Sequence, residues 1–186
     1  MMKKAVFLDR DGVINIDHAY VYRPEEFEFV DGVFNAARMW VAAGYELVIT
    51  TNQSGIGRGY YTEEDFWHLC DWMKSRFEAE GAPITAIYFC PHHPEKALEA
   101  YRCHCDCRKP EPGMILRAQK EHGYDLAQCL MVGDKLSDVK AAERAGIPTR
   151  ILVGKDGLAT PILEAPATLV ARNLLEATTL FLKDQA

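Results

Sequence analysis

Short apolar runs alternate with segments of helical periodicity, and this alternation constrains the fold more than any other feature of the chain. Five runs of four to six residues predict buried strands: Ala5–Leu8, Glu46–Thr51, Ala86–Cys90, Gln128–Val132 and Thr149–Val153. Strands that alternate with helices form a parallel sheet, because each parallel crossover needs a helix to return the chain. We therefore expect an α/β fold in which helices cover both faces of a doubly wound parallel sheet.

Three of the intervening segments carry clear helical signals. Thr62-Glu63-Glu64-Asp65 resembles a capping box at a helix start. An apolar stripe of helical spacing follows it, at Phe66, Leu69, Cys70, Met73 and Phe77. Asp138–Gly146 and Asn173–Lys183 predict two further helices. Arg10–Asp31 and Pro91–Pro112 show no such period, and long irregular segments of compact domains are usually functional.

Length and charge narrow the classes of protein that this chain can belong to. Its 186 residues suit one domain spanning residues 1–186, and the 48% of hydrophobic residues is ordinary for a globular protein. A net charge of −6 argues against nucleic-acid binding and against a polybasic membrane contact. Neither a signal peptide nor an apolar run of ~20 residues is evident. We expect a cytoplasmic monomer that acts on a small molecule.

Polar side chains follow three of the predicted strands at the point where each strand ends. Asp9 and Asp11 come directly after the first, Thr51 ends the second, and Asp134 follows Gln128–Val132. The carboxyl ends of parallel strands meet at one edge of a sheet, where ligands of such folds bind. Topology alone therefore predicts that these four side chains lie close together.

The carboxylates among these groups favour a magnesium site. A calcium loop of the EF-hand type is excluded, because Val13, Ile14 and Tyr20 occupy positions that require an oxygen ligand, a glycine and a glutamate. Carboxylates that crowd one pocket need a cation, and Mg²⁺ also takes waters and a phosphate oxygen. The hydroxyl of Thr51 and the ammonium of Lys109 can stabilise a phosphoryl group in transfer. A carboxylate can also attack phosphorus and form an aspartyl-phosphate.

Four motifs together resemble those of the haloacid dehalogenase superfamily of phosphatases. They are Asp9-Arg10-Asp11-Gly12, the strand-ending Thr51, the Arg108-Lys109 pair and Gly133-Asp134 with Asp138 one helical turn later. The resemblance implies a Rossmann-like fold of that type. It implies that Asp9 is the nucleophile, that Asp11 is the general acid and base, and that Thr51 and Lys109 hold the phosphoryl group. Mg²⁺ would bind Asp9, Asp134 and the Asp11 carbonyl. Asp138 is either a helix-surface acid or a group that steadies Lys135.

Cysteines and histidines crowd one of the irregular segments. Cys90-Pro91-His92 and Cys105-Asp106-Cys107 form two close pairs with a loop between them, as in a closed tetrahedral zinc site. In a reducing compartment this pattern indicates a metal site before disulfides. Such a zinc ion would staple the loop and fix the direction of Arg108 and Lys109. His93, Cys103 and His104 are alternative ligands.

Nearly the whole chain resembles the capless, zinc-stapled D-glycero-D-manno-heptose-1,7-bisphosphate 7-phosphatases of nucleotide-heptose synthesis for lipopolysaccharide. The resemblance lies in Asp17–Val21, Thr51–Gly55, Cys90–Pro94 and Cys105–Pro110. It implies removal of the C7 phosphate of that sugar bisphosphate, with Arg108 available for the second phosphate. The implied substrate contacts are Asp17, His18, Ala19, Tyr20, Thr51, Asn52, Gln53, Ser54, Arg108, Lys109 and Lys135.

Three other functions fit parts of the same pattern. Histidinol-phosphate phosphatases share the catalytic motifs and the zinc loop, but tend to carry Asp where this chain has Ser54. Polynucleotide 3′-phosphatases share the motifs, and the acidic composition counts against them. A zinc-bound binding module without activity would not need a competent residue at every catalytic position.

Overall fold

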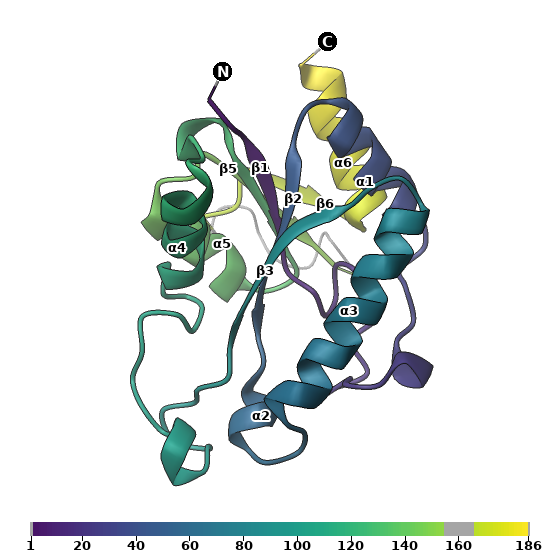
Figure 1. Cartoon of the computed structure of the whole chain (residues 1–186). Helices are drawn as coiled ribbons and strands as arrows, with labels where there is room; N and C mark the ends of the chain where they lie inside the picture. The colour runs from purple at the N-terminus through teal and green to yellow at the C-terminus, as the bar shows by residue number, and fades with distance from the viewer. Residues whose placement is uncertain (1, 155–165, 186) are drawn as a thin grey trace.

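A six-stranded parallel sheet, in the order β3-β2-β1-β4-β5-β6, forms the centre of the protein (Figure 1). The computed structural model describes residues 2–154 and 166–185. Its strands are β1 Ala5–Leu8, β2 Glu46–Asn52, β3 Ile84–Cys90, β4 Leu130–Gly133, β5 Thr149–Val153 and β6 Leu169–Ala171. The chain adds β2 and β3 on one side of β1, then β4 to β6 on the other. The predicted doubly wound parallel sheet is confirmed, and the winding reverses at β1.

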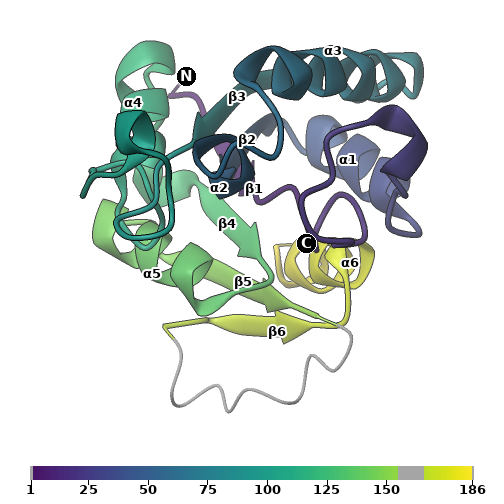
Figure 2. The same cartoon turned by 90° about the horizontal axis from the view of Figure 1, so that it is seen from below.

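Helices cover both faces of this sheet (Figure 2). They are α1 Val33–Ala42, α2 Ser54–Gly57, α3 Glu63–Ala79, α4 Gly113–His122, α5 Leu136–Ala145 and α6 Leu174–Asp184. Helices α1, α3 and α6 pack on one face, and α4 and α5 pack on the other. Short 3-10 helices cover Pro24–Glu26, Glu99–Tyr101 and Leu126–Gln128.

The buried strand β1 divides the hydrophobic core into two layers. Successive side chains of a strand point to opposite faces of the sheet. Val6 and Leu8 accordingly pack into the core beneath α1, α3 and α6, whereas Ala5 and Phe7 pack against α4 and α5. All four are fully buried. An apolar run without polar alternation is what a strand covered on both faces requires.

The predicted capping box and apolar stripe of α3 are confirmed. The Thr62 hydroxyl accepts the Asp65 N–H at 3.1 Å, and the Asp65 carboxylate accepts the Thr62 N–H at 2.9 Å. The five residues of the predicted stripe are the buried residues of α3. Asn173 caps α6 by accepting the Glu176 N–H.

Several predicted boundaries are wrong for local reasons. Strand β4 begins at Leu130 rather than Gln128, because the Asp125 side chain caps a 3-10 turn that ends at Gln128. Helix α5 begins at Leu136, two residues before the predicted Asp138. Strands β2 and β3 extend to Asn52 and back to Ile84. Strand β6 was not predicted, because three residues are too few to show a period.

The two long irregular segments hold only single-turn helices. Within residues 2–154 and 166–185, no inserted cap domain covers the carboxyl edge of the sheet, as predicted. No helix in this described part of the chain is long and apolar enough to cross a membrane.

Candidate active site

The carboxyl edge of the sheet brings Asp9 and Lys109 together, although a hundred residues separate them. Asp9 follows β1 and its N–H donates to the Val132 carbonyl of β4 at 3.1 Å. The buried Lys109 ammonium lies 2.9 Å from Asp9 Oδ1 and 2.6 Å from Asp138 Oδ1, and it donates to the Thr50 carbonyl at 2.7 Å. Its three donors are therefore all used, and its position is fixed.

The carboxylates outnumber the cation at this point. Asp9, Asp134 and Asp138 offer oxygens within 4.8 Å of one another. Burial, and then the charge of Asp138, raise the pKa of Asp9 well above its ordinary value, although Lys109 opposes them. Burial opposes the charge of Lys109, yet the carboxylates of Asp138 and Asp9 raise its pKa. The cluster therefore retains excess negative charge.

The acids of the cluster differ in how many bonds they already make. Asp138 is buried, pairs with Lys109, and accepts the Asp134 and Lys135 N–H groups at 3.1 and 3.0 Å. The surface role considered for Asp138 is wrong, because this acid positions Lys109 and the start of α5. Asp134 Oδ1, in contrast, is buried and has no hydrogen-bond partner in the described part of the chain. Free carboxylate oxygens of this kind suit Mg²⁺.

Gly12 allows Asp134 to approach the loop after β1. Its φ of +90° lies in the left-handed region, and a Cβ there would collide with the Asp134 carboxylate. The Asp-x-Asp-Gly sequence therefore needs its glycine for a steric reason.

Asp11 lies apart from this cluster and faces the pocket. Its carboxylate accepts hydrogen bonds from Arg10 and Asn15, both at 3.0 Å, and from Gln53 at 3.2 Å. Burial raises the pKa of Asp11, but the Arg10 charge and the three hydrogen bonds outweigh it and lower the pKa below its ordinary value. Without a ligand, Asp11 is therefore ionised and can accept a proton.

A pocket of about 550 Å³ opens beside Asp11 and Lys109. The predicted substrate residues that line it are Asp17, Ala19, Tyr20, Asn52, Gln53, Ser54, Arg108, Lys109 and Lys135. Thr51 lies buried next to it and accepts a hydrogen bond from Gln53. Lys135 lies 3.8 Å from Asp17, a contact that links α5 to the loop after β1.

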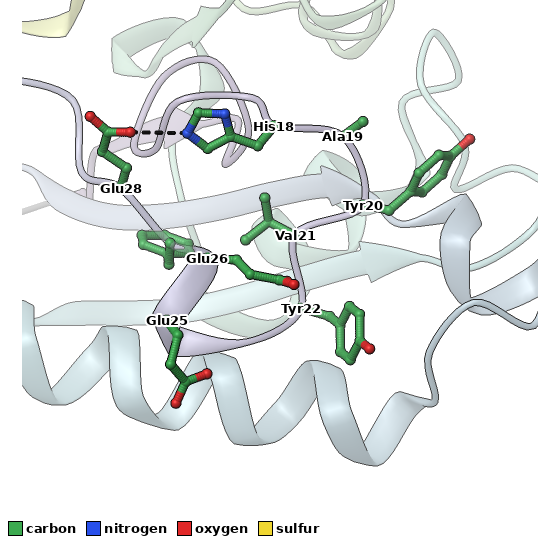
Figure 3. Close-up of a pocket in the computed structure, with 9 residues that line it drawn as sticks. His18, Ala19, Tyr20, Val21, Tyr22, Glu25, Glu26 and Glu28 are labelled. Atoms are coloured by element: carbon green, nitrogen blue, oxygen red, sulfur yellow. Dashed lines mark hydrogen bonds and ion pairs between the residues drawn. The ribbon is translucent and has the colours of Figure 1, made fainter.

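His18 is the predicted contact that the structure places elsewhere. It lines a neighbouring open hollow with Tyr22 and three glutamates, and its ring lies 3.0 Å from Glu28 (Figure 3). Ala19 and Tyr20, its neighbours, both have left-handed backbone angles, with φ of 58° and 55°. Strained backbone angles of this kind in non-glycine residues are typical of loops that form part of a binding site.

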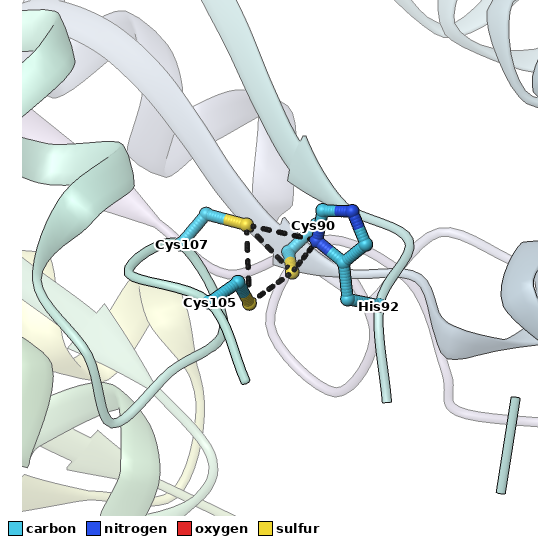
Figure 4. Close-up of side chains that lie close together, drawn as sticks. All are labelled: Cys90, His92, Cys105 and Cys107. Atoms are coloured by element: carbon cyan, nitrogen blue, oxygen red, sulfur yellow. Dashed lines mark hydrogen bonds between the residues drawn. The ribbon is translucent and has the colours of Figure 1, made fainter. Parts of the chain in front are cut away.

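Four side chains of metal-ligand type meet at the end of β3, and they are the four that the spacing predicts (Figure 4). Cys90 Sγ lies 3.6 Å from both His92 Nδ1 and Cys105 Sγ. Cys107 Sγ lies 3.4 Å from His92 Nδ1 and 3.5 Å from Cys105 Sγ. Cys107 Sγ also lies 2.8 Å from Cys90 Sγ. Ligands about 2.0–2.3 Å from one tetrahedral zinc ion lie roughly 3.3–3.8 Å apart, so the donor types and all but this shortest distance fit that metal.

The alternative ligands lie outside this cluster. Cys103 is exposed, and His93 Nδ1 accepts the N–H groups of Glu95 and Lys96 instead. His104 does not belong to the cluster. The hydrogen bond between Cys107 and Cys90 lowers the pKa of Cys107 to about 5 despite burial, which favours the thiolate that a metal requires.

Asn52 joins the cysteine loop, residues 91–112, to the carboxyl edge of the sheet. Its side-chain oxygen accepts the Lys109 N–H at 3.0 Å, and its amide donates to the Lys109 carbonyl at 3.2 Å. Arg108 lines the pocket together with Lys109 and donates to the His92 carbonyl at 3.3 Å. Arg108 makes no ion pair within residues 2–154 and 166–185.

The residues that sequence reasoning missed are Tyr61 and Ser137, both of which line the pocket. Tyr61 lies beyond the glycine-rich segment Gly55–Gly59, and no motif includes it. Ser137 occupies a variable position of the Gly-Asp-x-x-x-Asp motif, and its place between Asp134 and Asp138 is the sequence feature that could have indicated its role.

Comparison with known proteins places the chain among phosphatases. A HAD-hydrolase-like family model matches residues 106–177. The chain is 52% identical over 153 residues to a D-glycero-alpha-D-manno-heptose-1,7-bisphosphate 7-phosphatase of Burkholderia mallei, over 82% of this chain and 81% of that protein. It is 49% identical over 174 residues to the D-glycero-beta-D-manno-heptose-1,7-bisphosphate 7-phosphatase of Vibrio cholerae, over 94% of each chain.

A solved structure extends the likeness to three dimensions. The crystal structure of D,D-heptose 1,7-bisphosphate phosphatase from B. bronchiseptica, complexed with magnesium and phosphate, matches with a TM-score of 0.84. The two chains are 33% identical, and the match covers 98% of this chain and 99% of the other.

Proposed function

Because this chain belongs to the D,D-heptose 1,7-bisphosphate phosphatase family of HAD-like hydrolases, we propose that it removes the C7 phosphate of D-glycero-D-manno-heptose 1,7-bisphosphate. The observation that carries the proposal is the pair of cations in one pocket. Lys109 is bound to Asp9, whereas Arg108 faces the same pocket without an acidic partner in the described residues. One cation serves the reacting phosphate, and the other is free for a second phosphate.

In the first step the Asp9 carboxylate attacks the phosphorus of the C7 phosphate. The bond between this phosphorus and the oxygen on C7 breaks, which gives an aspartyl-phosphate. Lys109 and the Thr51 hydroxyl stabilise the charge on the phosphoryl oxygens. Asp11 donates its proton to the leaving C7 oxygen. The negative charge of the bound phosphate favours the protonated form of Asp11, which Arg10 disfavours in the free protein.

In the second step Asp11 acts as a base. It is again ionised after the leaving group has taken its proton, and it accepts a proton from the water that attacks the phosphoryl group. Release of phosphate regenerates Asp9. Asp9, Asp134 and the Asp11 carbonyl would hold Mg²⁺, which when bound neutralises charge on the phosphoryl oxygens.

A structural metal site and a place in nucleotide-heptose synthesis complete the proposed function. Cys90, His92, Cys105 and Cys107 would hold a structural zinc ion, since four protein ligands leave no open position for chemistry. We propose one domain, acting as a cytoplasmic monomer in nucleotide-heptose synthesis, without nucleic-acid or membrane partners.

Replacement of Arg108 tests the substrate directly. Arg108→Ala should lower kcat/KM for the heptose 1,7-bisphosphate roughly 10- to 100-fold, the size of one lost charged hydrogen-bonding group. Hydrolysis of an aryl monophosphate should change less than about threefold, because that substrate has no second phosphate. Steady-state kinetics on both substrates measures the difference.

Arg102→Ala is the matched control, since this arginine lies in the same loop and donates to the Ala97 carbonyl. It should leave both rates near the wild-type values. Equal losses for both substrates in Arg108→Ala would mean that Arg108 serves the reacting phosphate. If the wild type hydrolysed histidinol phosphate faster than the heptose 1,7-bisphosphate, the proposed substrate would be wrong.

Magnesium should stabilise the fold in a pH-dependent way. Burial, and then Asp138, raise the pKa of Asp134 from 3.8 to about 6. An acid whose pKa is higher in the folded than in the unfolded state stabilises the fold when it is protonated. For Asp134 this stabilisation is complete at a pH below the unfolded pKa of 3.8, and it is lost as the pH rises through the folded pKa of about 6. The part of the Tm of metal-free protein that depends on Asp134 should therefore fall over this range, measured as the difference from Asp134→Asn.

Added MgCl₂ should raise the Tm at pH 7 and have little effect at pH 4, where the side chains of Asp9 and Asp134 are protonated. Thermal denaturation with and without MgCl₂ measures this shift. Asp134→Asn is the control and should remove most of the Mg²⁺ response at pH 7. Equal Mg²⁺ shifts at both pH values would contradict this metal site.

A further inference from the structure

A tyrosine outside all the motifs completes a hydrogen-bond chain that ends on the catalytic groups. Tyr61 is 5% exposed, and its hydroxyl donates to Gln53 Oε1. Gln53 Nε2 then donates to Thr51 Oγ1 at 2.8 Å and to Asp11 Oδ2 at 3.2 Å. Every donor and acceptor of the Gln53 side chain is thus engaged, and two of its partners belong to the proposed reaction.

The tyrosine hydroxyl selects one of two amide orientations. The two ends of a glutamine amide are similar in shape but opposite in polarity. Burial raises the pKa of Tyr61, so its hydroxyl keeps the proton that it donates to the Gln53 oxygen. With the amide reversed, that oxygen would face the Asp11 carboxylate, and two acceptors would repel each other. The observed orientation gives Asp11 a donor.

Apolar contacts hold the tyrosine ring in place. The ring stacks on Tyr22 with centroids 5.1 Å apart and an interplanar angle of 6°. It packs in a small cluster with Ile56, Phe66 and Cys70. The backbone of Gly55 passes so close that a Cβ there would collide with the Tyr61 ring. The hydroxyl is therefore positioned by the fold before a substrate arrives.

We propose that Tyr61 is a positioning residue that, through Gln53, holds the Asp11 carboxylate and the Thr51 hydroxyl in the geometry needed for phosphoryl transfer. This inference rests on the proposed function of Asp11 and Thr51. In this role the Tyr61 hydroxyl donates to Gln53 and does not contact the substrate. Loss of the hydroxyl should therefore lower kcat and leave KM nearly unchanged.

The test is a double-mutant cycle with Tyr61→Phe and Gln53→Ala. Tyr61→Phe should lower kcat about three- to tenfold, the effect of one hydrogen bond, with KM changed less than about twofold. In the Gln53→Ala background, Tyr61→Phe should cause no further loss, because its effect passes through Gln53. Aryl phosphate and heptose bisphosphate should give the same result.

Tyr22→Phe is the matched control, because it removes a hydroxyl from the ring stacked on Tyr61 that contacts only Arg23 among the described residues. It should retain the wild-type kcat. An undiminished kcat in Tyr61→Phe would overturn the inference. So would an equal loss in the Gln53→Ala background, which indicates packing, or a rise in KM alone, which indicates direct contact with substrate.

A second measurement does not depend on activity. The side-chain amide signals of Gln53 in ¹⁵N-labelled protein, assigned by their loss in Gln53→Ala, should be sharp in the wild type and broadened or shifted in Tyr61→Phe. They should be unaffected in Tyr22→Phe. Identical signals in Tyr61→Phe and wild type would overturn the contact. An inactive wild type that shows the expected signals would overturn the proposed function and leave this contact standing.

Discussion

Asp9→Asn should reduce kcat by at least about 10⁴-fold, because an amide cannot attack phosphorus or form the acyl-phosphate bond. The substitution preserves the shape of the side chain and its contact with Lys109, so binding of substrate should persist. Burial and Asp138 disfavour the charged form of Asp9, and a neutral amide removes that cost. The Tm of metal-free Asp9→Asn should therefore equal or exceed that of the wild type.

Single-turnover kinetics, thermal denaturation and zinc analysis together check this result. Zinc content should be unchanged, since Asp9 lies outside the cysteine cluster. Asp11→Asn is the comparison, because it keeps the nucleophile and loses proton transfer, which is worth roughly 10²–10⁴ in rate. Substantial turnover by Asp9→Asn, with deamidation excluded by mass spectrometry, would show that Asp9 is not the nucleophile.

Loss of a predicted zinc ligand should have the largest effect on stability. Cys105→Ser should abolish binding of about one zinc ion per chain and lower the Tm by on the order of 10 °C, as expected for a loss of roughly 3 kcal/mol in a chain of this size. The reason is that a zinc ion held by the four side chains would cross-link Cys90 and His92 to Cys105 and Cys107, and so close the loop from Pro91 to Pro112. Catalysis should slow less than in Asp9→Asn, through displacement of Lys109.

Cys103→Ser is the matched control, because Cys103 is exposed and lies outside the cluster. It should retain zinc and the wild-type Tm. EDTA should remove Mg²⁺ and activity quickly, whereas zinc should leave only as the loop unfolds. Protein purified without chelators that contains no zinc would refute the structural zinc site, and zinc loss in Cys103→Ser alone would show that the ligand set is wrong.

The sequence was sufficient for the features that depend on local patterns. Uninterrupted apolar runs such as Ala5–Leu8 predict strands covered on both faces, and a run of parallel strands places Asp9, Thr51 and Asp134 at one edge. The capping box at Thr62 depends on residues three apart, so its hydrogen bonds are also predictable. Close spacing likewise identified the four members of the cysteine–histidine cluster.

The tertiary structure decided which partner each polar group takes. The sequence left Asp138 either as a helix-surface acid or as a group that steadies Lys135, yet this residue of α5 is buried against Lys109, which lies 29 residues earlier in a loop. His18 belongs to a motif but contacts Glu28, a residue ten positions later that no motif includes. Tyr61 belongs to no motif and nevertheless reaches Asp11 through Gln53.

The physical reason is the range of the interactions. Hydrophobic periodicity, capping and ligand spacing act over a few residues, so the amino-acid order records them directly. The hydrogen bond from Gln53 to Asp11, and the charges of Asp138 and Lys109 that shift the pKa of Asp9, arise between side chains from separate strands, helices and loops. Only packing of the sheet edge, the cysteine loop and α5 brings those side chains within bonding distance.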